Sequence, residues 1–176
     1  MPQVQIIQAR PTDAPALRQI RLEALKNHPE AFAADDSLDA KTDWAERIER
    51  NSGETGAIFL AYVQKNETGI SETDIAGMMG IFRGASSKVR HSATIWGVYV
   101  SPRFRKSGIG TQLLQTCLDW AKAHSVDIVK LGVVTTNASA RRLYERNGFK
   151  IYGTEPKALF VEGTYYDEFW MAREMD

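Results

Sequence analysis

Residues 93–118 contain the feature that most limits the folds open to this chain. An apolar, β-branched run ends at Ser101-Pro102, a short basic loop with two glycines follows, and a helical pattern then begins. The helix is predicted because apolar residues recur every three or four positions: Leu113, Leu114, Cys117, Leu118 and Ala121. The sequence therefore predicts a strand, a loop and an amphipathic helix that starts beside the end of the strand.

The loop before this helix has the character of an anion-binding site. Arg105 and Lys106 bring two positive charges, and Gly108 and Gly110 allow the backbone itself to approach a ligand. The first amides of a helix lack acceptors within the helix and lie at the positive end of its dipole. An ordinary strand-to-helix turn can contain the same two glycines, so the loop alone leaves both interpretations open.

Two familiar nucleotide motifs do not fit this loop. A Walker loop needs a lysine directly after its last glycine, and here Thr111 follows Gly110. A dinucleotide fingerprint needs a third small residue where Leu113 stands, and an acidic residue after the next strand, where residues 135–136 are threonines.

A second pattern follows at once. Residues 128–134 are predicted to form a strand parallel to the first, because one helix connects the two. Asn137 is expected to cap the next helix, and Gly148 to end it in the left-handed conformation. Helical spacing places Leu143, with Phe149, toward the core. One other side of that helix carries Asn137, Ala140, Arg141 and Tyr144.

Together the two patterns resemble the GCN5-related N-acetyltransferase (GNAT) superfamily. Residues 22–25, 29–32 and 165–168 further resemble its general bacterial branch. Arg105-x-x-Gly108-x-Gly110 is similar to the superfamily's acetyl-CoA pyrophosphate loop. Asn137-x-x-Ala140-x-x-Leu143-Tyr144-x-x-x-Gly148-Phe149 is similar to its second hallmark. The resemblance implies an α+β three-layer sandwich and a single domain over residues 1–176. Its central sheet would be twisted, mixed and mostly antiparallel, with about seven strands, flanking helices and strands 4 and 5 as a splayed parallel pair, in the order β-α-α-β-β-β-α-β-α-β-β.

The remaining segments agree with this order. Residues 57–63 and 75–82 are predicted to form a hairpin around a polar turn with Asn66 and Gly69. The segment 29–33 is expected to be a loop or short turn. The other predicted elements are strands at 4–9, 57–63, 75–82, 150–153, 159–161 and 165–172, a helix at 12–27, and a second helix capped by Thr42 that carries Trp44, Ala45 and Ile48.

The resemblance also implies acetyl-CoA as the acetyl donor and no metal. The loop would hold the pyrophosphate, the splayed strand edge would pair with the pantetheine arm, and Tyr144 would donate a proton or hydrogen bond to the leaving sulfur. Carried onto this sequence, the coenzyme-binding residues are Val98, Tyr99, Val100, Arg105, Lys106, Ser107, Gly108, Ile109, Gly110, Thr111, Asn137, Ala140 and Tyr144.

The acceptor side is less well defined by the resemblance. Many members have a glutamate on the strand where Trp96 stands here, so Glu30 and Glu168 become the candidate catalytic bases, with a water relay as the alternative. Phe32, Trp44 and Trp96 are expected to wall the acceptor pocket, although core packing also explains aromatic residues at such positions.

The implied activity is acetyl transfer from acetyl-CoA to a primary amine, by direct attack in a ternary complex. The acceptor is expected to be a small molecule such as an amino acid, a polyamine or an amine antibiotic. Two alternatives stay open: acetylation of a protein N-terminus or lysine, and a non-catalytic sensor that binds acyl-CoA.

Composition excludes several other classes. Lysine plus arginine and aspartate plus glutamate both number 22, which argues against nonspecific binding of nucleic acid. There is no apolar run of transmembrane length and no signal-peptide pattern, so a cytoplasmic protein that does not bind a membrane is expected. The three histidines (His28, His91, His124) lack ligand spacing, and Cys117 is expected in the core. A homodimer is expected from the aromatic residues of the last strand: Tyr165, Tyr166, Phe169 and Trp170.

Overall fold

A computed structural model of the chain describes residues 4–64 and 73–176, and the turn predicted at Asn66 and Gly69 lies outside these ranges. Within these ranges, seven strands form one sheet in the order β1-β2-β3-β4-β5-β7-β6, in which only the β4–β5 pair is parallel. The strands are β1 (Val4–Gln8), β2 (Gly56–Gln64), β3 (Thr73–Arg83), β4 (Ser92–Val100), β5 (Ile128–Val134), β6 (Lys150–Val161) and β7 (Thr164–Glu174). The helices are α1 (Ala14–Asn27), α2 (Asp36–Lys41), α3 (Trp44–Arg50), α4 (Ile109–Ala123) and α5 (Ala138–Arg146), with 3-10 turns η1 (Pro11–Asp13), η2 (Pro29–Ala31), η3 (Gly53–Thr55) and η4 (Pro102–Phe104).

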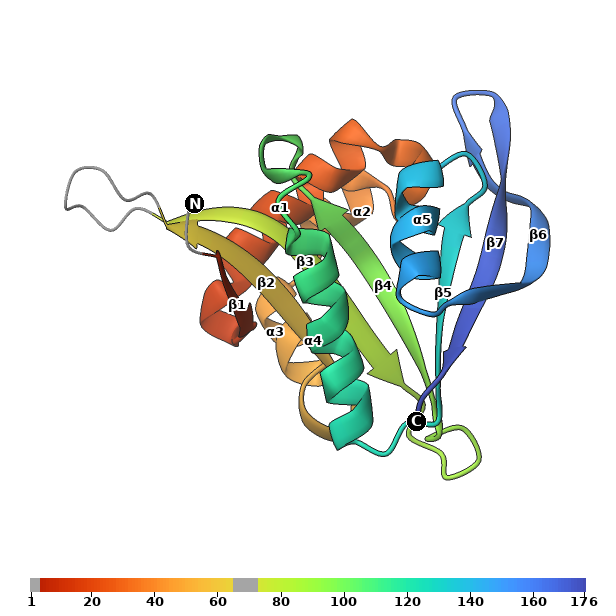
Figure 1. Cartoon of the computed structure of the whole chain (residues 1–176). Coiled ribbons are helices and arrows are strands. Elements are labelled where there is room, and N and C mark those ends of the chain that lie inside the picture. The colour runs from red at the N-terminus through yellow and green to blue at the C-terminus, as the bar shows by residue number, and fades with distance from the viewer. Residues whose placement is uncertain (1–3, 65–72) are drawn as a thin grey trace.

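Helices cover both faces of the sheet and give three layers (Figure 1). One core cluster joins the sheet to α4 and α5, and the other joins it to α1 and α3. Alternation along β4 sends Ile95 into the first cluster and Trp96 and Tyr99 into the second. The second face of β4 is therefore the one on which the α1–α3 segment meets the strand.

β4 and β5 separate along their length. They pair only from Ser92 to Thr94, and beyond Thr94 the paired residues of β4 have their partners on β3. In Figure 1 the two strands lie close together near the C-terminus and diverge toward the loop that precedes α4. The divergence leaves one edge of β4 without a strand partner, which confirms the predicted splayed pair.

A β-bulge bends β4 inside this open stretch. Trp96 pairs with Gly80 and Tyr99 with Met78, so three steps along β4 match two along β3. Gly97 lies in the bulge with φ +62°, and a Cβ there would lie 3.0 Å from the methyl carbon of Met78. The positive φ favours glycine here, and a side chain would also require the Met78 methyl to shift slightly.

The segment after α1 differs from the sequence prediction. One helix capped by Thr42 was expected, but the chain forms α2 and α3, each with its own aspartate cap. Asp35 accepts from the Leu38 amide at 2.9 Å, and Asp43 accepts from the Glu46 amide at 3.0 Å. The Thr42 hydroxyl instead donates to a carbonyl of α2, so the predicted cap at Thr42 is wrong. Two successive acidic caps divide a stretch for which hydropathy alone predicts one loop and one helix.

The final hairpin is also more continuous than predicted. β6 runs without a break from Lys150 to Val161, although its register with β7 shifts between Glu155 and Leu159. The predicted interruption near Pro156 is therefore an irregularity inside one edge strand, where a proline is tolerated. In the ranges 4–64 and 73–176, no helix has both the length and the apolar character that crossing a bilayer requires.

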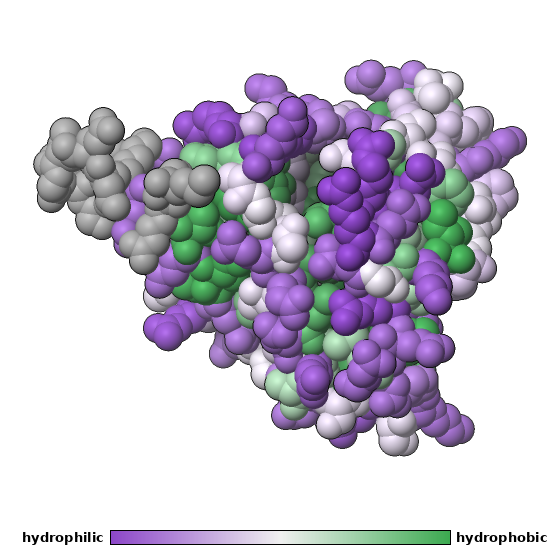
Figure 2. All heavy atoms as spheres, in the orientation of Figure 1, coloured by the Kyte–Doolittle hydropathy of each residue, from purple (hydrophilic) through white to green (hydrophobic). Residues whose placement is uncertain are grey.

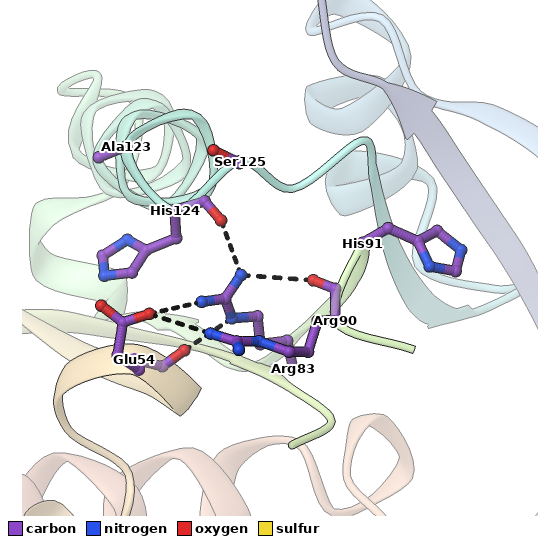
Figure 3. A pocket seen from close by; sticks show the side chains of 7 residues that line it. All are labelled: Glu54, Arg83, Arg90, His91, Ala123, His124 and Ser125. Atoms are coloured by element: carbon purple, nitrogen blue, oxygen red, sulfur yellow. Dashed lines mark hydrogen bonds and ion pairs between the residues drawn. The ribbon is translucent and has the colours of Figure 1, made fainter. Parts of the chain in front are cut away.

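A hollow of about 410 Å³ lies at the C-terminal end of α4, away from the loop that starts this helix (Figure 3). Arg83 lines it and donates four hydrogen bonds: to the Glu54 carbonyl at 2.6 Å, the His124 carbonyl at 2.7 Å, the Glu54 carboxylate at 2.9 Å and the Arg90 carbonyl at 3.4 Å. Its side chain is only 5% exposed. These bonds tie β3, η3 and the end of α4 together, so the hollow is a structural junction.

Candidate active site

The start of α4 forms a cradle of unpaired backbone donors. Gly108 is the N-cap residue in the left-handed conformation with φ +83°, and the Gln112 amide makes the first helical hydrogen bond to its carbonyl at 3.0 Å. The amides of Ile109, Gly110 and Thr111 come before that bond and so have no acceptor inside the helix. The residues from Arg105 to Gly108 are exposed. The loop predicted to bind an anion is thus exposed, and it leads into three amides without an acceptor inside the helix.

Arg105 links this loop to η2. Its Nε donates to the Val100 carbonyl at 3.2 Å, and its Nη2 lies 2.8 Å from Nε2 of His28. Because a guanidinium only donates, His28 Nε2 is the acceptor, and Nδ1 carries the proton that faces Glu30 Oε1 at 3.3 Å. From the sequence, His28 was considered only as a metal ligand, and its spacing argued against that role. Its contact with Arg105, 77 residues away, has no local signal.

The open edge of β4 contains the three strand residues expected to pair with the pantetheine arm. Val98 and Val100 are partly exposed on the α4 side, whereas the Tyr99 side chain is buried against α1. The Tyr99 hydroxyl donates to Glu23 at 3.0 Å and accepts from Asn27 at 2.9 Å. Burial raises its pKa, with the Glu23 carboxylate adding to the rise. Figure 2 shows hydrophobic residues between α4 and α5, over the place where β4 and β5 diverge.

The start of α5 agrees with the second sequence pattern. Asn137 Oδ1 accepts from the Ala140 amide at 3.1 Å, which confirms the predicted cap. Gly148 has φ +85°, as expected for the residue that ends the helix. The side-chain nitrogen of Asn137, Nδ2, is a donor separate from the Oδ1 that caps the helix.

The core face of α5 differs from the prediction. Tyr144, expected on the side away from the core, is 3% exposed, whereas Leu143 is only partly buried against Gly110. The ring of Tyr144 meets that of Phe149 edge to face at 6.0 Å. Burial raises the pKa of the Tyr144 phenol, and the neighbouring Cys117 thiol raises it further. Both Tyr144 and Cys117 belong to the α4-side core, so Cys117 lies in the core as predicted.

The structure places the two candidate bases on different elements. Glu30 is on η2 beside His28, and η2 in turn contacts β5 and β6. Glu168 is on β7, and a Cβ on Gly132 of β5 would lie 3.2 Å from its carboxylate. Burial raises the pKa of Glu168, and the Glu155 carboxylate raises it further. A raised pKa makes the ionised Glu168 carboxylate a stronger base than an ordinary glutamate.

The three aromatic residues expected around the acceptor do gather in one cluster, beside α1 and α3. Trp44 is 3% exposed and its indole donates to the Asp39 carbonyl at 3.2 Å, so it packs in the core. Phe32 and Trp96 are partly exposed and can border a ligand. Two arginines that the sequence did not single out lie against these rings, Arg21 and Arg47. Among the described residues, no group of three or more His, Cys, Asp or Glu side chains could hold a metal ion.

Comparison with known proteins agrees with this geometry. A family model described as the Acetyltransferase (GNAT) family matches residues 16–149. L-amino acid N-acetyltransferase AaaT of Escherichia coli is 26% identical over 98% of this chain and 99% of its own length. The L-methionine sulfoximine/L-methionine sulfone acetyltransferase of Pseudomonas aeruginosa is 32% identical over 95 residues, 54% of this chain and 52% of its own. The structure of Salmonella typhimurium yncA with its cofactor acetyl-CoA superposes with a TM-score of 0.77 at 21% identity, over 99% of this chain and 95% of that one.

Proposed function

Because the chain belongs to the acetyltransferase (GNAT) family, we propose that it transfers an acetyl group from acetyl-CoA to the primary amine of a small molecule, with amino acids as the acceptor class. The observation that carries this proposal is the open edge of β4, which leads from the bulge at Gly97 to the amide cradle at Gly108. The named activities of the two relatives above support the acceptor class. We also propose that residues 1–176 form one catalytic domain.

The residues present fit the donor. The amides of Ile109, Gly110 and Thr111 would bind the pyrophosphate, Arg105 and Lys106 would add positive charge, and Ser107 and Gly108 would complete the loop. The backbone of β4 from Val98 to Val100 offers strand-type hydrogen bonds to an extended amide chain. The Asn137 amide and Ala140 on α5 face the same arm from the other side of the opening in this proposal.

The chemistry then needs one bond exchange and two proton movements. The amine nitrogen bonds to the thioester carbon, the carbon–sulfur bond breaks, one proton leaves the nitrogen and one reaches the departing sulfur. A backbone N–H at Tyr99 or Val100 would stabilise the carbonyl oxygen, and Tyr144 would donate to the sulfur. Glu168, Glu30 or a water relay would accept the proton from the amine. Phe32 and Trp96 would border the acceptor, with Trp44 packed behind them.

A thiol-release assay tests the proposal. Purified protein with acetyl-CoA is offered amino acids, polyamines, aminoglycosides and peptides with free N-termini or lysines. Turnover on amino acids or other small amines supports it, and turnover confined to peptides would replace it with the protein-acetylating alternative. Calorimetric binding of CoA without turnover on any amine would favour an acyl-CoA sensor.

The proposal includes a cytoplasmic homodimer. Phe160 and Tyr165 at the tip of the β6–β7 hairpin are 62% and 57% exposed, and their rings lie 4.7 Å apart. Such an exposed aromatic pair is suited to a contact between two copies. Sedimentation velocity of the wild type and of a Phe160→Ser, Tyr165→Ser double variant tests it, because the variant should then sediment as a monomer.

A further inference from the structure

Two buried donors on the α1 side of β4 have no hydrogen-bond partner among the described residues. Within residues 4–64 and 73–176, three buried side-chain nitrogens lack one: Arg21 Nη1, Trp96 Nε1 and Arg141 Nε. The last lies 3.5 Å from the Glu145 carboxylate. That leaves Arg21 and Trp96, which share the second core face with the β4 bulge. A buried charged donor without an acceptor is unfavourable, so a site that leaves one open requires a ligand or a structural reason.

The same place has more positive than negative charge. Arg21 Nε pairs with Asp39 at 2.5 Å, and both side chains are at least nine-tenths buried. The Arg47 guanidinium lies 5.0 Å from the rings of both Trp44 and Trp96, contacts that do not neutralise its charge. Burial lowers the pKa of Arg47; the Asp39 carboxylate opposes this shift, and the like charge of Arg21 adds to it. Two guanidiniums therefore face one carboxylate, and an anionic group would balance them.

The cluster lies against the bulge of β4, beside the strand edge to which the proposed function assigns acetyl-CoA. A Cβ on Gly97 in the β4 bulge would lie 3.6 Å from Arg21 Nη1, so the open donor lies against the bulge. Phe32, whose ring is 5.0 Å from the Arg21 guanidinium, and Trp96 are partly exposed and form the outer edge of the cluster. A ligand that reached the bulge from this side would meet aromatic rings first and the guanidinium behind them.

We propose that Arg21, assisted by Arg47 and the Trp96 indole N–H, binds the carboxylate of an amino acid acceptor and so sets the preference for amino acids over simple amines. This inference rests on the proposed function and adds the residues that recognise the acceptor. The carboxylate would accept from Arg21 Nη1 and offset the unpaired charge. A polyamine, which has only positive charges, would be repelled by the same two guanidiniums.

The test compares amino acids with the same amines lacking the carboxylate: L-leucine with 3-methylbutan-1-amine, and L-phenylalanine with 2-phenylethylamine. Arg21→Lys keeps a positive charge beside Asp39 but removes the second guanidinium donor. Arg47→Gln removes the other charge from a partly exposed position. Lys26→Gln removes a charge from the exposed side of the same helix and is the matched control. Differences in amine pKa cancel, because each variant is compared with the wild type on the same pair of substrates.

The expected result is a fall in the ratio of kcat/KM for the amino acid to that for its amine by about 10- to 100-fold in Arg21→Lys, and by a smaller factor in Arg47→Gln. The ratio should not change in Lys26→Gln. An equal loss on both substrates in both arginine variants would make the cluster a structural support and overturn the inference. A wild type that uses amines and amino acids equally well would also overturn it, while leaving the proposed function intact. If Arg21→Lys does not fold, the ratio in Arg47→Gln alone decides between carboxylate recognition and structural support. A wild type inactive on every amine would refute the proposed function and this inference with it.

Discussion

Replacing Tyr144 by phenylalanine removes one oxygen from the candidate site and leaves the rest of the side chain in place. The ring would keep its edge-to-face contact with Phe149 and its position in the α4-side core. We therefore expect the free energy of unfolding to change by no more than about 1 kcal/mol, a range typical of one hydrogen bond. Any large kinetic effect would then report the lost hydroxyl.

The size of that effect follows from the environment of the phenol. Burial raises the pKa of Tyr144, so the group stays protonated throughout the working pH range, whereas a thiol has an ordinary pKa of about 8.5. Full proton transfer to the thiolate is then uphill, and in the proposed mechanism Tyr144 would act mainly by donating a hydrogen bond to the charge that develops on sulfur. A hydrogen bond to a charged group contributes about 1.5–3 kcal/mol. We expect kcat to fall about 100-fold in Tyr144→Phe, which corresponds to about 2.7 kcal/mol.

The measurements are steady-state thiol release, calorimetric affinity for acetyl-CoA and a pH–rate profile. Affinity should change little, and the wild-type profile should show no loss from a tyrosine up to about pH 10, because the raised pKa keeps the phenol neutral there. Tyr152→Phe is the control, since it makes the same chemical change at a residue that is 59% exposed on β6. An unchanged kcat in Tyr144→Phe would remove this residue from the mechanism.

Three further predictions follow from other parts of the structure. Arg105→Gln should weaken acetyl-CoA binding about 10- to 100-fold in calorimetry. The affinity for S-acetylpantetheine, which has no pyrophosphate, should not change. An equal loss for both ligands would contradict the assignment of Arg105 to the pyrophosphate. Glu155→Gln removes a charge that raises the pKa of Glu168. If Glu168 is the base, the acid limb of the kcat/KM–pH profile should therefore move to lower pH. An acid limb that does not move would favour Glu30 or a water relay. Arg83→Met should lower the free energy of unfolding by about 3 kcal/mol, and hence Tm by about 6–12 °C, because buried carbonyls lose their donor. The KM for acetyl-CoA should stay the same. An unchanged Tm would mean that the junction at the end of α4 does not stabilise the fold.

Much of the fold could be predicted because its determinants are local. The glycines at 108 and 148, the Asn137 cap and the strand–helix–strand connection between them lie within about fifty residues and act through neighbouring backbone groups. The prediction failed at the α2–α3 segment, where competing acidic caps decide the boundaries, and at α5, where a pattern of 3.6 residues per turn did not say which adjacent residue, Leu143 or Tyr144, would face the core.

The sequence by itself determined that a strand leads through a basic, glycine-containing loop into a helix, and that Asn137 and Tyr144 follow one crossover later. Only the tertiary structure decided which distant charges meet: Arg21 and Arg47 beside Trp96, His28 on Arg105, and Glu168 over Gly132. Backbone preferences extend over a few residues, whereas these contacts depend on which face of the sheet each helix covers. That choice is made by the burial of apolar surface across the whole chain.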